Sequence, residues 1–187
     1  VDGKLDLERI ARVIRESKAD LVALQEVDRK VKRSGNIDQP AELARLTKLE
    51  VAFGGNIPLQ GGEYGNAVLS RWPIKTQRNT KLPNHDQGEQ RGLLQVEIQL
   101  PEVAEPLLFF ATHFEHRRDD SERVASAGAV HELASKQPDS PALLAGDLND
   151  VPESKTLREL QTRWTVANAN NGPLPTIPVD VPRRQID

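Results

Sequence analysis

The sequence contains no cysteine, which excludes a small disulfide-held scaffold and a zinc centre built from thiolates. No apolar run approaches the roughly 18 residues that a membrane-spanning helix needs, so we expect no membrane span. Aromatic residues make up only 4% of the chain, and side chains on which nucleic-acid bases could stack are correspondingly few. Methionine is also absent, and we expect the sequence to be part of a longer translated protein.

Charge of neither sign predominates. The 187 residues include 25 Lys and Arg against 28 Asp and Glu, for a net charge of -3 with histidine neutral. This balance argues against a protein that wraps nucleic acid by bulk electrostatic attraction, although a local basic cleft stays open. One basic cluster comprises Arg29, Lys30, Lys32 and Arg33. It is either a loop that guides phosphate or an ordinary solvated loop.

Helical periodicity occurs in both halves of the chain. Apolar residues recur at the spacing of one helix face at Leu7, Ile10, Ala11 and Ile14. We expect further helices at 40–49, at 124–134 and through 157–160. Asp119 with Glu122 is expected to form a capping box for the third helix, and Asp150 with Glu153 is expected to cap the fourth.

Short apolar segments between these helices predict β-strands. We expect them at 21–24, 51–53, 67–70, 74–78, 92–100, 107–113 and 142–145. Helices at both ends of a run of strands predict a four-layer α/β sandwich, in which two packed mixed β-sheets are flanked by helices, as one domain over 1–187. A doubly wound parallel sheet is less favoured, because the strands between 51 and 113 follow one another without helices.

Polar side chains stand where three of these strands end. Glu26 follows the first apolar run, His113 ends the run 107–113, and Asp147 and Asn149 follow the run 142–145. Because strand ends at one sheet edge lie close together, these groups could converge. Their oxygen atoms suit Mg²⁺ or Mn²⁺. Taken singly, each residue also has an ordinary interpretation as a solvated charge, a half-buried histidine or a helix-capping turn.

Six segments taken together resemble one family. They are LVALQEVD (21–28), YGNAVLSRWPI (64–74), RGLLQVEI (91–98), FFATHFEH (109–116), ALLAGDLND (142–150) and PTIPVDVPRRQID (175–187). In this order they resemble the endonuclease/exonuclease/phosphatase superfamily, which includes deoxyribonucleases, abasic-site endonucleases, neutral sphingomyelinases and inositol polyphosphate phosphatases. The resemblance covers nearly the whole chain and implies Mg²⁺-dependent (or Mn²⁺-dependent) hydrolysis of a phosphoester by attack of an activated water on phosphorus.

The resemblance implies roles for the residues at the strand ends. Glu26 matches the metal-binding glutamate of the family. Asp147 and Asn149 match the pair that orients the attacking water and holds the phosphate, with Asp147 also close to the metal. His113 matches a histidine that contacts the scissile phosphate.

Other parts of the resemblance are less complete. Asp187 matches an aspartate that orients a catalytic histidine near the C-terminus, while Asn66 and Arg91 are open to either phosphate contact or hydrogen bonding at the core edge. The opening Asn-containing motif and the closing Ser-Asp-His motif have no match. We therefore expect the chain to lack the family's first strand and its C-terminal strands, as a piece of a longer protein or as a catalytically impaired form.

The motifs do not specify the substrate. Small phosphodiesters, phospholipid head groups, inositol phosphates and nucleic acids all stay open. A non-catalytic phosphate-binding module of the same fold is the alternative from another functional class. A deoxyribonuclease-like repair enzyme is a third reading, and it predicts a basic cleft with salt-sensitive binding to DNA.

Overall fold

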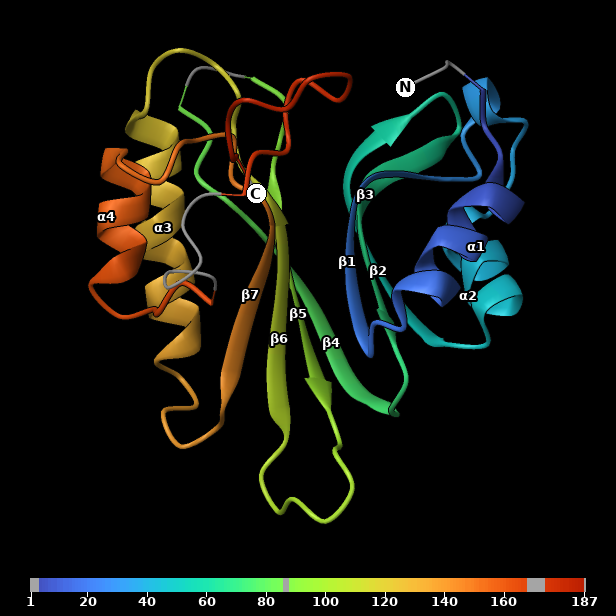
Figure 1. Ribbon diagram of the computed structural model, residues 1–187, viewed down its shortest axis with the longest axis horizontal. Helices are drawn as coiled ribbons and strands as arrows, with labels where there is room; N and C mark the ends of the chain where they lie inside the picture. Colours follow the sequence, from blue (N-terminus) through green and yellow to red (C-terminus); the bar gives the residue numbers. More distant parts are fainter. Residues whose placement is uncertain (1–3, 86–87, 168–173, 187) are drawn as a thin grey trace.

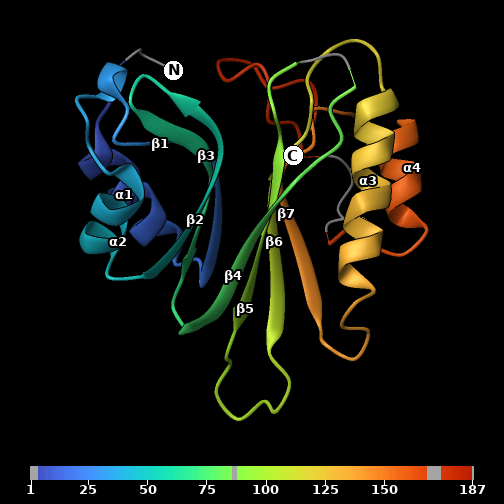
Figure 2. The same ribbon diagram turned by 180° about the vertical axis from the view of Figure 1, so that it is seen from behind.

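The computed structural model describes residues 4–85, 88–167 and 174–186. Its elements are α1 (Leu7–Ser17), β1 (Leu21–Arg29), the 3-10 turn η1 (Lys32–Ser34), α2 (Gln39–Thr47), β2 (Glu50–Leu59), β3 (Gly62–Ser70), β4 (Ile74–Lys81), β5 (Gly92–Ile98), β6 (Leu107–His113), α3 (Ser121–Ala134), β7 (Ala142–Asp147) and α4 (Lys155–Gln161). Two β-sheets lie between α1 and α2 on one side and α3 and α4 on the other (Figures 1 and 2). The four-layer α/β sandwich is therefore confirmed. None of the helices in these ranges is long and apolar enough to cross a membrane.

The two sheets differ in strand direction. The first has the order β1-β3-β2 and the second the order β4-β5-β6-β7. We expected both to be mixed, but the first is antiparallel throughout. Its strands β2 and β3 are joined by a two-residue turn, and so short a connection can only reverse the chain. Among the strands in the described ranges, only β6 and β7 pair in parallel, because α3 supplies the crossover that a parallel pair requires.

Alternation along the central strands assigns each apolar side chain to one layer. Leu94 and Val96 of β5 are fully buried between the two sheets. Leu108 and Phe110 of β6 pack instead against α3 and α4. Successive residues of a strand point to opposite faces, so the second sheet is covered by apolar side chains on both. This packing fixes the position of His113 at the end of β6.

Two of the expected helix caps are wrong. The N-cap of α3 is Asp120, whose side chain makes no capping hydrogen bond, and the pair Asp119 and Glu122 forms no capping box. The N-cap of α4 is Ser154 rather than Asp150. The Glu122 carboxylate accepts a hydrogen bond from a loop amide instead. The Asp150 carboxylate accepts hydrogen bonds from two side chains, one on α3 and one on α4.

Replacing Ser154 with Ala is expected to destabilise the protein by about 1 kcal/mol. The Ser154 hydroxyl oxygen accepts a hydrogen bond from the backbone N–H of Leu157 at 3.1 Å, and alanine leaves that donor without its cap. Urea denaturation measures the change in the free energy of unfolding. Ser135→Ala is the control, because the Ser135 hydroxyl lies at the C-terminal end of α3 and donates to a backbone carbonyl. An equal loss in both variants would contradict the capping role.

Candidate active site

Glu26 lies on an irregularity of β1. We expected the strand to end before Glu26, but it continues to Arg29. Pairing with β3 shifts between Leu24 and Val27, so that two residues of β1 face the single residue Asn66. Glu26 has a φ of 59°, in the left-handed region that residues other than glycine rarely adopt. Such bulges redirect side chains beside functional sites. The Glu26 side chain is exposed and makes no hydrogen bond or ion pair with any residue that the structure describes.

The end of β7 positions Asp147 and Asn149. Asp147 is the register partner of His113 on β6. A Cβ atom on the preceding Gly146 would lie 2.0 Å from a backbone oxygen of β6, and its φ is 147°, so glycine is required for this close approach. Asn149, with a φ of 51°, donates its backbone N–H to Oδ1 of Asp147 at 2.8 Å. Its side-chain Nδ2 donates one of its two protons to the carbonyl that follows β6.

His113 faces the Asp147 carboxylate from the neighbouring strand. Its Nε2 lies 3.8 Å from Oδ2 of Asp147, and its Nδ1 lies 3.1 Å from Nη1 of Arg91. Burial and the adjacent positive charge of Arg91 lower the pKa of His113 to about 4. The imidazole is therefore neutral at neutral pH and can donate a hydrogen bond without carrying a charge.

Arg91 and Asn66 are buried where the two sheets meet. Nη1 of Arg91 lies 2.7 Å from Oε1 of Glu89, and Nη2 lies 3.2 Å from Nδ1 of His116. Asn66 is 1% exposed and donates from Nδ2 to the carbonyl of Gly92 at 3.0 Å, which is a hydrogen bond at the core edge. The sequence reasoning missed Glu89 and His116, although each lies within three residues of a site residue and carries a titratable group.

Glu26 lies close to the groups on the second sheet. Burial and the negative charge of Glu26 raise the pKa of Tyr64 well above its usual range, and the charge of Arg91 opposes this rise. Gln25 and Gly146, the neighbours of Glu26 and Asp147 in the sequence, line one cavity of about 430 Å³. The structure thus brings the irregular part of β1 near the end of β7, which pairs with β6.

Asp187 lies outside the described residues, and its role stays a prediction. The carbonyl of Ile186 accepts a hydrogen bond from the backbone N–H of Leu148 at 2.9 Å. The last described residue of the chain therefore lies beside the loop that follows β7.

The basic cluster after Glu26 is largely paired within the protein. Arg29 forms an ion pair with Glu63. Arg33 donates two hydrogen bonds to Asp28, at 2.9 and 2.8 Å, and this contact lowers the pKa of Asp28 below its usual range. Each arginine also lies over an aromatic ring. Lys30 and Lys32 are the charges of this cluster that have no ion-pair partner among the described residues, so they are the ones left to attract phosphate.

An arginine of α3 holds the loop that follows β7. Arg123 is 5% exposed, and its Nε lies 3.0 Å from Oδ2 of Asp150. Its Nη1 donates to the carbonyls of Glu115 at 3.0 Å and Arg117 at 2.6 Å. Although burial opposes it, hydrogen bonds from Thr156 and Arg123 keep the pKa of Asp150 low. These contacts link the loop after β7 to both α3 and α4.

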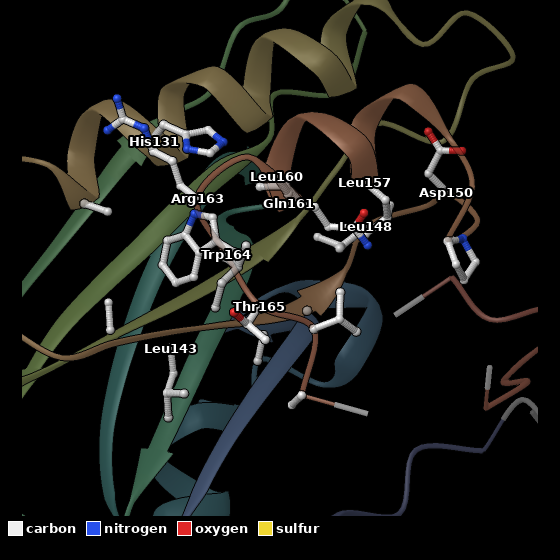
Figure 3. A pocket seen from close by; sticks show the side chains of 18 of the residues that line it. His131, Leu143, Leu148, Asp150, Leu157, Leu160, Gln161, Arg163, Trp164 and Thr165 are labelled. Atoms are coloured by element: carbon white, nitrogen blue, oxygen red, sulfur yellow. The ribbon is translucent and has the colours of Figure 1, made fainter. Parts of the chain in front are cut away.

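A larger groove of about 1060 Å³ runs along β7 beside α4. Leu143, Leu157, Leu160 and Trp164 give it an apolar lining (Figure 3). None of the predicted site residues within the described ranges lines this groove. The candidate site is therefore the polar end of the sandwich and not this groove.

Glu26 and Asp147 are the carboxylates suited to a divalent cation. Within the described ranges, no group of three or more His, Cys, Asp or Glu side chains is placed to hold a metal ion. Mg²⁺ is commonly held by only one or two carboxylates, with water and substrate phosphate completing its coordination. An exposed glutamate and a partly exposed aspartate therefore fit Mg²⁺ or Mn²⁺, and they do not fit a closed zinc site.

Comparisons of sequence place the chain among known proteins. The sequence profile of the endonuclease/exonuclease/phosphatase family matches residues 1–187. YbhP of Escherichia coli (strain K12) is 29% identical over 197 aligned positions, which cover 97% of this chain and 75% of YbhP.

Solved structures share the fold. An endonuclease/exonuclease/phosphatase from Beutenbergia cavernae DSM 12333 superposes with a TM-score of 0.69 at 29% identity, over 86% of this chain and 48% of that one. For Bacteroides thetaiotaomicron mannosyl-6-phosphatase Bt3783 the TM-score is 0.68 at 19% identity, over 83% and 61%. Truncated Caenorhabditis elegans TDP2 gives 0.59 at 22%, over 79% and 56%.

The solved relatives are longer than the part that matches. This chain spans 48% of the first and 61% of the second of these structures. The two likenesses below a quarter identity show the fold alone, whereas the family profile covers the whole sequence. The chain therefore belongs to the endonuclease/exonuclease/phosphatase family, whose members are generally metal-dependent phosphoesterases or nucleases.

Proposed function

We propose that the protein is a Mg²⁺-dependent phosphoester hydrolase in which water attacks phosphorus directly. The observation that supports this proposal is the approach of His113 to Asp147 at the ends of β6 and β7, with Asn149 hydrogen-bonded to Asp147. Two carboxylates suit a divalent cation, and a neutral imidazole and an amide suit phosphate oxygens. Mn²⁺ is the alternative ion, since it accepts the same oxygen ligands.

Each residue has a distinct part in the proposed mechanism. Glu26 and Asp147 would hold the Mg²⁺, which supplies charge stabilisation as a Lewis acid. Nδ2 of Asn149 and Nε2 of His113 donate hydrogen bonds to the non-bridging phosphate oxygens. Asp147, whose Oδ1 accepts a hydrogen bond from the backbone N–H of Asn149, takes a proton from the attacking water. In-line attack displaces the alcohol, which takes its proton from solvent, and no covalent intermediate is needed.

The proposed substrate is a small phosphoester, a class that includes phospholipid head groups and inositol phosphates. A protein that follows a nucleic-acid backbone needs several unpaired cations along its surface. Here Arg29 and Arg33 are paired with Glu63 and Asp28, and the net charge is -3. One structural neighbour bears the name mannosyl-6-phosphatase, which supports the same choice.

The test is a panel of phosphoesters assayed with Mg²⁺ and with EDTA. It includes p-nitrophenyl phosphate, bis(p-nitrophenyl) phosphate, a soluble phospholipid analogue and a duplex oligonucleotide. We expect turnover of at least one small ester with Mg²⁺ and none with EDTA. Turnover that persists in EDTA contradicts the mechanism. Phosphate binding without any turnover identifies the non-catalytic module, and cleavage of the duplex alone reassigns the substrate.

Replacing Glu26 with Gln is expected to raise the Mg²⁺ concentration needed for half-maximal activity by about 10–100-fold. The amide keeps the size of the side chain but removes the negative charge that attracts the cation. Activity measured against Mg²⁺ concentration reports the change, and saturating Mg²⁺ restores part of the turnover. Glu16→Gln, at an exposed position on α1, is the matched control. An unchanged Mg²⁺ requirement in Glu26→Gln would remove Glu26 from the metal site.

A further inference from the structure

The Arg91 guanidinium is surrounded by partners within the protein. Its side chain is 7% exposed. Nη1 lies 2.7 Å from Oε1 of Glu89 and 3.1 Å from Nδ1 of His113, and Nη2 lies 3.2 Å from Nδ1 of His116. Nε is buried and has no hydrogen-bond partner among the described residues. Both Nη groups of Arg91 thus contact other side chains of the protein.

The contact with Arg91 fixes where the proton of His113 resides. A guanidinium has five N–H donors and no acceptor, so Nδ1 of His113 must accept the hydrogen bond. A neutral imidazole carries one proton, and this proton must then lie on Nε2. Nε2 is 3.8 Å from Oδ2 of Asp147, which is too long for a hydrogen bond between them. The Nε2–H group therefore lies beside the Asp147 carboxylate but forms no hydrogen bond with it.

Glu89 holds the guanidinium in this orientation. The two Nη groups make a pair of contacts, Nη1 with the Glu89 carboxylate and the His113 ring and Nη2 with the His116 ring, which requires the planar, forked shape of arginine. A lysine ammonium is a compact charge on a flexible stem and cannot reproduce this pair of contacts. The site therefore uses the shape of Arg91 as well as its charge.

We infer that Arg91 is a positioning residue that keeps His113 in the Nε2–H tautomer and aims this donor at the scissile phosphate. The inference departs from the sequence-based alternative in which Arg91 itself binds phosphate. It rests on the proposed function only for the identity of the ligand that Nε2–H meets. The tautomer itself can be measured in the absence of any substrate.

The first test is NMR of the complete protein with isotope-labelled histidine, at a pH where His113 is neutral. We expect the wild-type spectrum to show His113 entirely as the Nε2–H tautomer, with an Nδ1 shift typical of a hydrogen-bond acceptor. Arg91→Leu is expected to lose that shift and gain an Nδ1–H population. A wild-type proton on Nδ1, or spectra unchanged by Arg91→Leu, would overturn the inference. If Arg91→Leu fails to fold, Arg91→Met, which also lacks an N–H donor, carries the same comparison.

The second test separates positioning from phosphate binding by steady-state kinetics. If Arg91 positions His113, Arg91→Leu lowers kcat by about 10²-fold with KM nearly unchanged, and Arg91→Lys does not restore kcat. If Arg91 binds phosphate, KM rises and lysine restores much of the loss, which overturns the inference. Arg71→Leu is the control, since Arg71 is exposed and pairs with Asp20 at the opposite end of the first sheet. An NMR result as expected together with no hydrolysis by the wild type would refute the proposed function but retain the positioning role.

Discussion

Phosphoester turnover is expected to fall by about 10²–10⁴-fold when Asp147 is replaced with Asn. The amide has nearly the same size, so it retains the position at the end of β7. It cannot accept a proton from water at neutral pH, and it removes one of the two negative charges proposed to hold the cation. Initial rates with saturating Mg²⁺ measure the loss, and circular dichroism verifies that the variant is folded.

Asp139→Asn is the matched control for this substitution. Asp139 is exposed in the connection between α3 and β7, and its replacement is expected to leave turnover unchanged. Turnover in Asp147→Asn within a few-fold of the wild-type value would exclude Asp147 as the base that activates water.

Replacing Arg123 with Leu is expected to destabilise the protein by about 3–5 kcal/mol. The guanidinium is 5% exposed and is paired with Asp150, so its removal leaves a buried carboxylate without its cation. Two backbone carbonyls also lose their donor. Urea denaturation measures the free energy of unfolding, and we expect the midpoint to fall well below that of the wild type.

Arg45→Ala is the control for the loss of an arginine. Arg45 pairs with Glu42 on the exposed face of α2, where ion pairs contribute little, so the midpoint is expected to stay close to that of the wild type. Equal midpoints for the wild type and Arg123→Leu would show that Arg123 does not brace the loop after β7. The double variant Arg123→Leu with Asp150→Leu is expected to recover part of the stability, because it removes both buried charges.

Local patterns were sufficient to predict the layers of the fold. The period of Leu7, Ile10, Ala11 and Ile14 predicted α1. Ala11 and Ile14 are buried against the first sheet, whereas Ile10 stays exposed. The apolar segment 92–100 predicted β5, and its residues Leu94 and Val96 are fully buried. Such patterns succeed because a single element must bury its apolar face, whatever its neighbours are.

Features that depend on pairing between distant segments could not be predicted. The left-handed conformation of Glu26 follows from a shift in register opposite Asn66, which no local sequence signal specifies. The direction of the first sheet follows likewise from its strand pairing. Nothing in the sequence around Ser154 and Asp150 shows that an arginine on α3 binds the aspartate and leaves the serine to cap α4.

The residues of the candidate site were likewise only partly predictable from the sequence. His113 and Asp147 end β6 and β7, as the apolar runs before them indicated, whereas Glu26 lies inside β1 at its irregularity. The contacts of Arg91 with Glu89 and His113 depend on the packing of a loop against β6, and they change its expected part in the site. Sequence position therefore indicated which residues gather, and the structure was needed to show which of them face one another.

The most direct measurement of the shared cation is a Mn²⁺ titration followed by EPR, on the complete protein and on Glu26→Gln, Asp147→Asn and the double variant. If the two carboxylates hold one ion, each single variant loses the tight Mn²⁺ site, and the double variant loses little more than either single one. Retention of the tight site in both single variants, or two sites of which each variant loses a different one, would show that Glu26 and Asp147 do not form a common metal site.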